Sequence, residues 1–247
     1  MVRIAAALVS VVAGASIPNA TLNNGMGFPM ISLGTWQYDD DTAEAAVKLA
    51  LQTGFNHIDT AHNYNNQAGV GKALAQFDRS SYFITTKVMS VNSNAYAGTT
   101  KLLEEDLTLL GLDSVDLMLL HSPARTCKAI QEQWRAMEDF YAAGKARAIG
   151  VSNYCVSSFE CLFQTAKVTP AVNQIEVHVG MGPDPKGLVS YDQSKGIVTQ
   201  AYSPLGDGSS ELITGDLVSG IGKAHDMTGA QVSMRWLIER DIALTTK

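Results

Sequence analysis

The chain has 247 residues, of which 46% are hydrophobic and 17% charged, and its formal net charge is −6. This length and composition suit one domain with a sizeable core. The acidic balance and the lack of a run rich in lysine and arginine argue against nucleic acid as a partner.

The first fifteen residues differ in character from the rest. Arg3 precedes an apolar run at residues 4–14, and the run ends in Ala13-Gly14-Ala15. A positive start, a short apolar stretch and small residues before a cleavage point are typical of a secretory signal, and the run is too short to span a membrane. We expect residues 1–15 to be a signal-like segment that indicates a secretory or organelle route. The alternatives are an extra strand or helix beneath the folded domain, and a cytoplasmic location.

From residue 20 onward, strand-like and helix-like patterns alternate. Residues 20–32 predict a β-hairpin, because Asn24-Gly25 is a turn signal. Eight strand candidates follow, at 31–36, 56–61, 82–88, 115–121, 146–153, 171–178, 197–204 and 242–247. Helical patterns lie between them, at 40–54, 100–111, 130–144 and 230–240. Alternating strands and helices imply a parallel sheet with right-handed crossovers, so the predicted fold class is α/β, a (β/α)8 TIM barrel with an N-terminal β-hairpin.

Four polar residues stand at or just beyond the ends of successive strand candidates: Asp59, Tyr64, Lys87 and His121. In a parallel barrel the carboxyl ends of all strands meet at one face, where the chemistry gathers. Reduction of a carbonyl leaves charge on its oxygen, and a proton donor placed there stabilises that charge. Tyr64 is the candidate donor. We expect the Lys87 ammonium to lower the pKa of the phenol, Asp59 to hold Lys87, and His121 to bind the substrate oxygen.

Each of these residues also has a structural interpretation. Asp59 and Tyr64 could be a loop aspartate and a packing tyrosine, Lys87 could reach solvent, and His121 could be a hydrogen-bonded core histidine. Their joint occurrence at strand ends favours a site over those alternatives. For the other histidines we expect a core role for His57, a loop role for His62, support of a loop for His178 and a helix surface for His225.

Six segments carry a resemblance to a known family: HIDTAHNYNN, ITTKV, LLHSP, GKARAIGVSN, AVNQIEVH and QAYSPLG. In this order and spacing, the chain resembles the aldo-keto reductases from about Thr21 to Lys247. The resemblance implies that Tyr64 is the acid, that Lys87 and Asp59 adjust its pKa and that His121 orients the substrate. It also implies that the hairpin closes the barrel floor, that the cofactor is NADPH, that the substrate is a small carbonyl compound and that no metal is needed.

No GxGxxG motif follows a strand, so the sequence does not predict a dinucleotide site of the Rossmann type. The residues that would bind the cofactor are instead those that the resemblance implies. Ser152, Asn153 and Gln174 would bind the nicotinamide carboxamide, and Tyr202 would stack on the ring. Ser203, Leu205 and Gly206 would follow the pyrophosphate, and Lys247 would neutralise the 2′-phosphate. Trp36 would line the substrate pocket. The alternatives are rim packing for Tyr202 and Trp36, and a helix cap for Ser152-Asn153.

The two ends of the barrel region raise further expectations. Lys247 is the last residue, so we expect the final helix of the family that the chain resembles to be missing. Residues 20–247 would then form a barrel truncated at its C-terminus. An uncovered flank would favour self-association. The three cysteines, Cys127, Cys155 and Cys161, show no ligand or redox spacing, and we interpret them as free thiols.

Three function classes compete at this point. The first is an NADPH-dependent carbonyl reductase, which the four polar residues favour. The second is an NADPH-binding regulatory or weakly active relative. The third is a barrel enzyme of another kind, such as an aldolase that uses Lys87 as a nucleophile. The sequence does not identify the physiological substrate.

Overall fold

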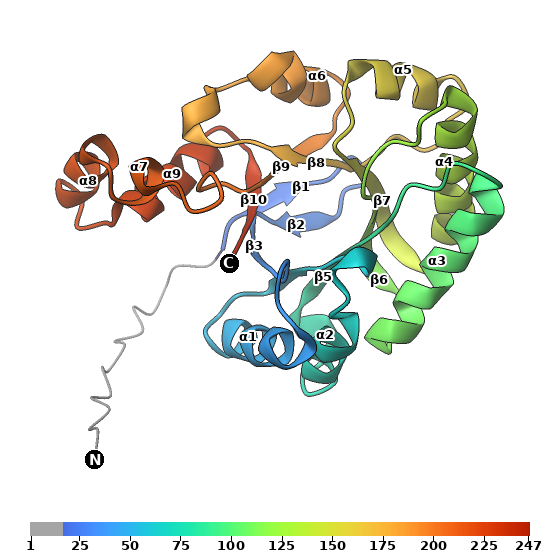
Figure 1. The fold of residues 1–247 in the computed structure, drawn as a ribbon, viewed down its shortest axis with the longest axis horizontal. Coiled ribbons are helices and arrows are strands. Elements are labelled where there is room, and N and C mark those ends of the chain that lie inside the picture. Colours follow the sequence, from blue (N-terminus) through green and yellow to red (C-terminus); the bar gives the residue numbers. More distant parts are fainter. Residues whose placement is uncertain (1–16) are drawn as a thin grey trace.

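The computed structural model describes residues 17–247, so the signal-like segment at 1–15 lies outside the described residues. Eight parallel strands close into a barrel, in the order β10-β3-β4-β5-β6-β7-β8-β9, and helices surround it (Figure 1). The strands are β3 (Ile31–Gly34), β4 (His57–Asp59), β5 (Phe83–Val88), β6 (Val115–Leu120), β7 (Ala146–Ser152), β8 (Val172–Glu176), β9 (Val198–Tyr202) and β10 (Ala243–Thr246). The predicted (β/α)8 barrel is confirmed.

Helices connect consecutive strands along the outside of the barrel. They are α1 (Asp40–Gln52), α2 (Gln67–Leu74), α3 (Ala95–Leu110), α4 (Cys127–Ala142), α5 (Val156–Phe163), α6 (Leu188–Ser194), α7 (Ser210–Thr214), α8 (Asp216–Lys223) and α9 (Gly229–Ile238). The last three all lie between β9 and β10 and extend to one side of the barrel (Figure 1). In the described part of the chain, no helix follows β10.

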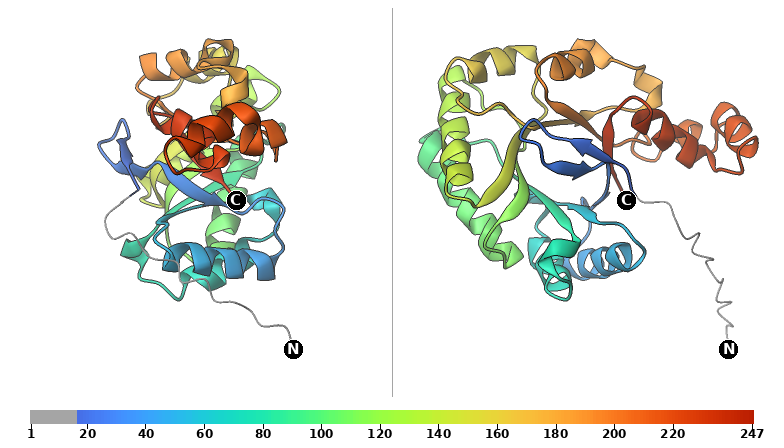
Figure 2. Two further views of the ribbon diagram at one scale, coloured as in Figure 1. Left: turned by 90° about the vertical axis from the view of Figure 1, so that its left-hand side faces the viewer. Right: turned by 180° about the vertical axis from the view of Figure 1, so that it is seen from behind.

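The N-terminal hairpin covers one end of the barrel. Strands β1 (Asn19–Thr21) and β2 (Gly27–Pro29) pair antiparallel and lie across the barrel opening (Figure 2). The turn uses Gly25 at φ +83°, a conformation that favours glycine. Leu22 and Phe28 are buried against Leu117 and Leu119 from inside the barrel. The hairpin thus fills this end, and the opposite end of the barrel is formed by the carboxyl ends of the strands.

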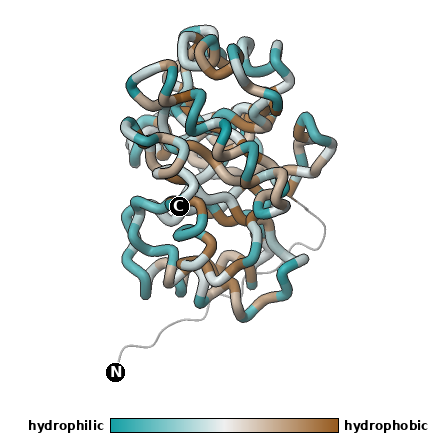
Figure 3. Tube along the Cα trace, turned by 90° about the vertical axis from the view of Figure 1, so that its right-hand side faces the viewer, coloured by the Kyte–Doolittle hydropathy of each residue, from teal (hydrophilic) through white to brown (hydrophobic). Residues whose placement is uncertain are grey.

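The main apolar core lies between the strands and the surrounding helices. Every residue of β5 and of β6 is buried, and Trp134 and Met137 of α4 and Leu103 of α3 pack over them. Hydrophilic positions follow the outer loops and helix faces, and hydrophobic positions gather toward the strands (Figure 3). Apolar burial at about 25 cal/mol per Å² is the main term that holds such a shell to its sheet. The rigid barrel then fixes where each strand ends.

The interpretation of all three cysteines as free thiols is wrong. Cys127, the first residue of α4, and Cys161, near the end of α5, form a disulfide with a Cα–Cα distance of 5.1 Å. The helices α4 and α5 are neighbours around the barrel, and this packing brings together two residues that are 34 positions apart. Spacing along the chain does not reveal such a pair. Cys155 is free and exposed.

Candidate active site

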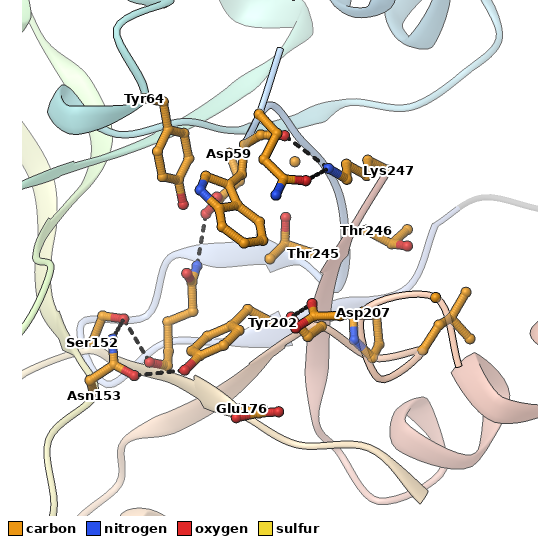
Figure 4. A pocket seen from close by; sticks show the side chains of 18 of the residues that line it. Asp59, Tyr64, Ser152, Asn153, Glu176, Tyr202, Asp207, Thr245, Thr246 and Lys247 are labelled. Carbon is orange, nitrogen blue, oxygen red and sulfur yellow. Dashed lines mark hydrogen bonds between the residues drawn. The ribbon is translucent and has the colours of Figure 1, made fainter. Parts of the chain in front are cut away.

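A cleft of about 770 Å³ opens at the carboxyl ends of the strands (Figure 4). Eleven of the thirteen predicted site residues line it: Trp36, Asp59, Tyr64, His121, Ser152, Asn153, Gln174, Tyr202, Ser203, Leu205 and Lys247. The two exceptions are Lys87, which is fully buried behind the lining, and Gly206, which lies in the adjacent loop. The barrel therefore brings together residues from the ends of seven of its strands.

Lys87 lies at the centre of the polar cluster. Its Nζ donates hydrogen bonds to Asp59 Oδ1 at 2.6 Å, to the Thr60 carbonyl at 2.9 Å and to the Tyr64 hydroxyl at 3.2 Å. The parallel register of β4 and β5 pairs Asp59 with Thr85, so Lys87, two residues further along, projects from the same face of the sheet. These three acceptors account for all three protons of the ammonium group. A buried lysine is held charged by this arrangement.

The charges of the cluster follow from its burial. Burial opposes a positive charge on Lys87, but the neighbouring Asp59 and Tyr64 outweigh it and raise the pKa of the ammonium. Burial raises the pKa of the Tyr64 phenol, and Lys87 opposes that rise only in part. The expected net lowering of the pKa of Tyr64 is therefore wrong for this structure. At neutral pH Tyr64 carries its proton, which is the form that an acid needs before it donates.

His121 borders the same space. Its ring centroid lies 5.7 Å from that of Tyr64 in an edge-on arrangement. Burial and the charge of Lys87 lower the pKa of the imidazole to about 4, so it is neutral at physiological pH. Among the described residues, its buried Nδ1 has no hydrogen-bond partner. A neutral imidazole next to the phenol can bind a carbonyl oxygen without competing for the proton of Tyr64.

Gln174 connects the cluster to the other side of the cleft. Its Nε2 donates to Asp59 Oδ2 at 2.7 Å and to Gln200 Oε1 at 2.8 Å. Gln200 in turn donates to Ser32 Oγ at 3.3 Å inside the barrel. Gln174 therefore has a second role that the sequence did not indicate: it holds the Asp59 oxygen that Lys87 does not bind. Gln200 is buried and could not be recognised from its position along the chain.

A second polar cluster faces the first across the cleft. Tyr202 donates its hydroxyl proton to Asn153 Oδ1 at 3.0 Å, and Asn153 Nδ2 donates to the His121 carbonyl at 3.0 Å. Ser152 Oγ donates to the Gln174 carbonyl at 2.8 Å. The residue that caps α5 is Cys155, which excludes the alternative that Ser152-Asn153 is a helix cap. The side chains at the ends of β7 and β9 thus line the cleft and bond one another across it.

The loop after β9 turns sharply beside this cluster. Ser203 and Asp207 have φ +48° and +52°, and Ser203 Oγ donates to Asp207 Oδ1 at 2.6 Å. In the part of the chain that the structure describes, the N–H groups of Leu205, Asp207 and Gly208 have no hydrogen-bond partner. Gly206 has φ +58°, a conformation that favours glycine, and a Cβ there would lie 3.1 Å from the Leu212 side chain. Unpaired N–H groups in a tight loop form a concavity that suits an anion.

Lys247 closes the cleft opposite that loop. Its Nζ donates to the Trp36 carbonyl at 3.1 Å and to Gln37 Oε1 at 2.6 Å, and it lies 5.4 Å from the centre of the Trp36 ring. Trp36 is 48% exposed. Among the described residues that line the cleft, Lys247 carries the one permanent positive charge, whereas Glu176 and Asp207 are acidic.

Six polar lining residues were not predicted from the sequence: Gln37, Asn63, Glu176, Asp207, Thr245 and Thr246. A signal was present for two of them. Asn63 directly precedes Tyr64, and Glu176 lies two residues after Gln174, which places both β8 side chains on one face of the strand. For Gln37 and Asp207 only the folded loops show their position.

Other kinds of site receive no support from residues 17–247. No group of three or more histidine, cysteine or carboxylate side chains could hold a metal ion there. Over the same residues, no helix has the length and apolar character needed to cross a membrane. His57 is a core residue, as expected: its ring bonds the Pro29 carbonyl and Thr85 Oγ1, both at 2.8 Å.

Comparison with known proteins gives one consistent result. The profile of the Aldo/keto reductase family matches residues 25–245. Morphine 6-dehydrogenase of Pseudomonas putida is 35% identical, over 93% of this chain and 81% of that protein. The 9,11-endoperoxide prostaglandin H2 reductase of Trypanosoma cruzi is 36% identical, over 92% of this chain and 80% of that protein.

Solved structures agree. The crystal structure of an aldo/keto reductase from Brucella melitensis superposes with a TM-score of 0.85 at 36% identity, covering 94% of this chain and 88% of that one. An aldo-keto reductase from Bombyx mori, solved in complex with NADP, gives a TM-score of 0.83 at 31% identity, covering 95% of this chain and 84% of that one.

Proposed function

The chain belongs to the aldo-keto reductase family of oxidoreductases, and we propose that it reduces aldehydes and ketones to alcohols with NADPH and with Tyr64 as the proton donor. The observation that carries this proposal is the geometry of Tyr64. Its hydroxyl lies 3.2 Å from Lys87 Nζ, and Lys87 is itself held by Asp59. No other described tyrosine in the cleft has a lysine as its partner.

The cleft fits an extended nicotinamide dinucleotide. Ser152, Asn153 and Gln174 offer hydroxyl and amide groups to a carboxamide, and the ring of Tyr202 lies beside them for stacking (Figure 4). The loop at 203–208 offers the free N–H groups to a pyrophosphate. The bound nicotinamide supplies the hydride. The aldo-keto reductase from Bombyx mori that was solved with NADP supports this cofactor.

The protein's own residues handle the proton. The Tyr64 hydroxyl donates its proton to the carbonyl oxygen of the substrate as negative charge develops there. Lys87 lies 3.2 Å from the phenol oxygen, so the phenolate that remains is paired with a fixed positive charge. Asp59 keeps Lys87 charged and in place, and the neutral His121 orients the carbonyl oxygen. Proton donation by a positioned side chain contributes about 10²–10⁴-fold to such a rate.

A preference for NADPH over NADH is supported by Lys247, which would bind the 2′-phosphate. A point charge of this kind attracts a phosphate without fixing its geometry as an arginine fork does. Because Lys247 would have to leave its bonds to Trp36 and Gln37, we propose a modest preference.

The substrate is a carbonyl compound that enters between Trp36, Asn63 and Tyr64. Trp36 offers an apolar face, and Asn63 offers an amide for a polar substituent near the carbonyl. Two relatives are named for morphine and for prostaglandin H2, and both names support a mouth that accepts large ring compounds. The test is NADPH oxidation against a panel of small aldehydes, aromatic aldehydes and cyclic ketones. Turnover with none of them, or covalent trapping of a carbonyl substrate on Lys87 by borohydride, would contradict the proposed function.

We also propose a secretory or organelle route, which the disulfide Cys127–Cys161 supports because structural disulfides persist mainly in oxidising compartments. N-terminal sequencing of the protein from its source cell tests this. A mature chain that begins near Ser16 is expected, and an intact Met1 or Val2 would contradict it.

A further inference from the structure

We propose that His62 is a positioning residue for Tyr64: by its bond to the buried Asp106 it fixes the short turn that aims the phenol at Lys87. This inference rests on the proposed function and adds to it a pair of residues outside the cleft. His62 and Tyr64 begin and end the same single 3₁₀ turn, η1 (His62–Tyr64), between β4 and α2.

The contact between the turn and α3 is short. His62 Nδ1 lies 2.6 Å from Asp106 Oδ1, so the imidazole donates its proton to the carboxylate. The side chain of Asp106 is fully buried, and that of His62 is 25% exposed. Asp106 belongs to α3, which is packed against α2 and β5. The turn that carries Tyr64 is thus anchored to the outer helix layer and not only to the barrel interior.

The second oxygen of Asp106 is anchored to the strand that carries the lysine. Thr86 Oγ1 donates to Asp106 Oδ2 at 2.9 Å, and Gln67 Nε2 donates to Thr86 Oγ1 at 2.8 Å. Thr86 directly precedes Lys87 on β5, so by strand alternation Thr86 faces α3 while Lys87 faces the interior. One carboxylate therefore holds both the turn of Tyr64 and the strand of Lys87. It sets the relative position of the two groups whose 3.2 Å contact carries the proposed function.

The turn itself has few backbone hydrogen bonds. Its backbone bonds are Tyr64 N–H to the Ala61 carbonyl at 3.1 Å and Asn65 N–H to the His62 carbonyl at 3.4 Å. Asn65 follows in a left-handed conformation, φ +56°. A single turn is not stable by its own hydrogen bonds, because few bonds offset the entropy of fixing its backbone. Side-chain bonds at its two ends therefore hold the turn: His62 to Asp106 at its start, on the outer side of the barrel, and Tyr64 to Lys87 at its end.

The burial of Asp106 supports a role in anchoring the turn that carries Tyr64. A buried carboxylate is unfavourable unless it is paired and hydrogen-bonded, and burial raises the pKa of Asp106 while His62, Gln67 and Thr86 oppose the rise. Among residues 17–247, the one ion-pair partner of Asp106 is His62. An apolar residue would fill the same space between α3 and β5 more favourably if packing were its only role.

Three variants test the proposal. His62→Ala removes the donor, His62→Asn keeps a short side-chain donor for Asp106, and His225→Ala is the control, since His225 is an exposed histidine in the turn after α8. Turnover is measured by NADPH oxidation, NADPH affinity by quenching of protein fluorescence, and the state of Tyr64 by ¹³C NMR of ring-labelled tyrosine. The Tyr64 signal is assigned by its loss in Tyr64→Phe, and the NMR experiment needs no substrate.

For His62→Ala we expect kcat to fall about tenfold or more, because a displacement of about 1 Å at a reacting group can cost about 10²-fold. NADPH affinity should be unchanged and the Tyr64 resonance displaced. His62→Asn should restore kcat to within about threefold of the wild type and return the resonance, whereas His225→Ala should change neither. A Tyr64 resonance that is unmoved in His62→Ala overturns the proposal, whatever the turnover. If the wild type turns over no carbonyl compound, the proposed function fails, and the NMR comparison still decides whether His62 positions Tyr64.

Discussion

Gln174 Nε2 donates a hydrogen bond to Asp59 Oδ2 at 2.7 Å, and this bond joins the two sides of the cleft. Asp59 belongs to the cluster around Lys87, whereas Gln174 lies beside Ser152, which donates to its carbonyl. A ligand that binds Gln174 therefore binds a residue that is itself hydrogen-bonded to Asp59, the ion-pair partner of Lys87.

Gln174→Met keeps the volume of the side chain and removes both donors. We expect the dissociation constant of NADPH to rise about tenfold, which corresponds to about 1.4 kcal/mol and to the loss of one hydrogen bond to the neutral carboxamide. We also expect kcat to fall, because Asp59 loses its second partner. The control is Gln133→Met: Gln133 is equally buried but bonds Thr99 Oγ1 of α3 and the Met89 carbonyl, and none of these residues lines the cleft. Equal effects of the two substitutions on NADPH binding would remove Gln174 from the site.

Lys247→Ala should weaken NADPH binding more than NADH binding. The expected change is about threefold to tenfold for NADPH, the size of one partly exposed charge contact, with little change for NADH. Fluorescence titration with both cofactors measures it, and increasing salt should reduce the difference. Lys195→Ala is the control, because Lys195 lies on the α6 side outside the cleft lining. Equal loss for both cofactors would show that Lys247 does not meet the 2′-phosphate.

Stability should depend on pH through His57. Burial lowers the pKa of His57 to about 4, whereas an unfolded histidine titrates near 6.5. The neutral form is favoured in the fold, so this contribution to the free energy of unfolding is fully present above about 6.5 and is lost as the pH falls toward about 4. Between about pH 7 and pH 5 the wild type should lose roughly 2 kcal/mol more than His57→Gln in urea unfolding. Equal losses in the two proteins would show that His57 accepts a proton in the fold.

Cys155 should be the one reactive thiol of the described chain under non-reducing conditions. Hydrogen bonds from Ser157 and Ser158 lower the pKa of its thiol to about 7, and Cys127 and Cys161 are joined. Alkylation should therefore modify Cys155 alone, with a midpoint near pH 7, and reduction should expose the other two. Ser158→Ala should move the midpoint to higher pH, while Ser219→Ala on α8 should not. Labelling of Cys127 or Cys161 before reduction would contradict the disulfide.

Much of the barrel was readable from the sequence because each element carries its own signal. The strands β5 and β6 are short runs rich in apolar and β-branched residues, and α3 ends where Gly111 allows a left-handed turn at φ +66°. Seven of the eight strand predictions extend one or two residues too far at their C-terminal ends, for example at 171–178 against Val172–Glu176. Those extra residues belong to the loops that form the cleft mouth. The helical patterns did not include the short helices α6, α7 and α8, which have 7, 5 and 8 residues.

The parts that could not be predicted all depend on contacts between distant segments. Asp106 reads as one more acidic residue of a solvent-facing helix, and only packing against Thr86 and His62 reveals it as buried. The bonding of Cys127 to Cys161 depends in the same way on the packing of α4 against α5. The direction in which the pKa of Tyr64 shifts also could not be predicted without the fold, because the sequence indicates the nearby lysine but not the extent of burial.

The most direct test of the proposed function is the turnover of Tyr64→Phe. NADPH oxidation with the best carbonyl substrate should fall by about 10²–10⁴-fold, because the proton donor is gone, while NADPH should still quench protein fluorescence with the affinity of the wild type. Tyr96→Phe is the control, since Tyr96 bonds Asp139 on the helix surface away from the cleft, and it should turn over like the wild type. Turnover of Tyr64→Phe within a few-fold of the wild type, with intact NADPH binding, would contradict the assignment of Tyr64 as the proton donor.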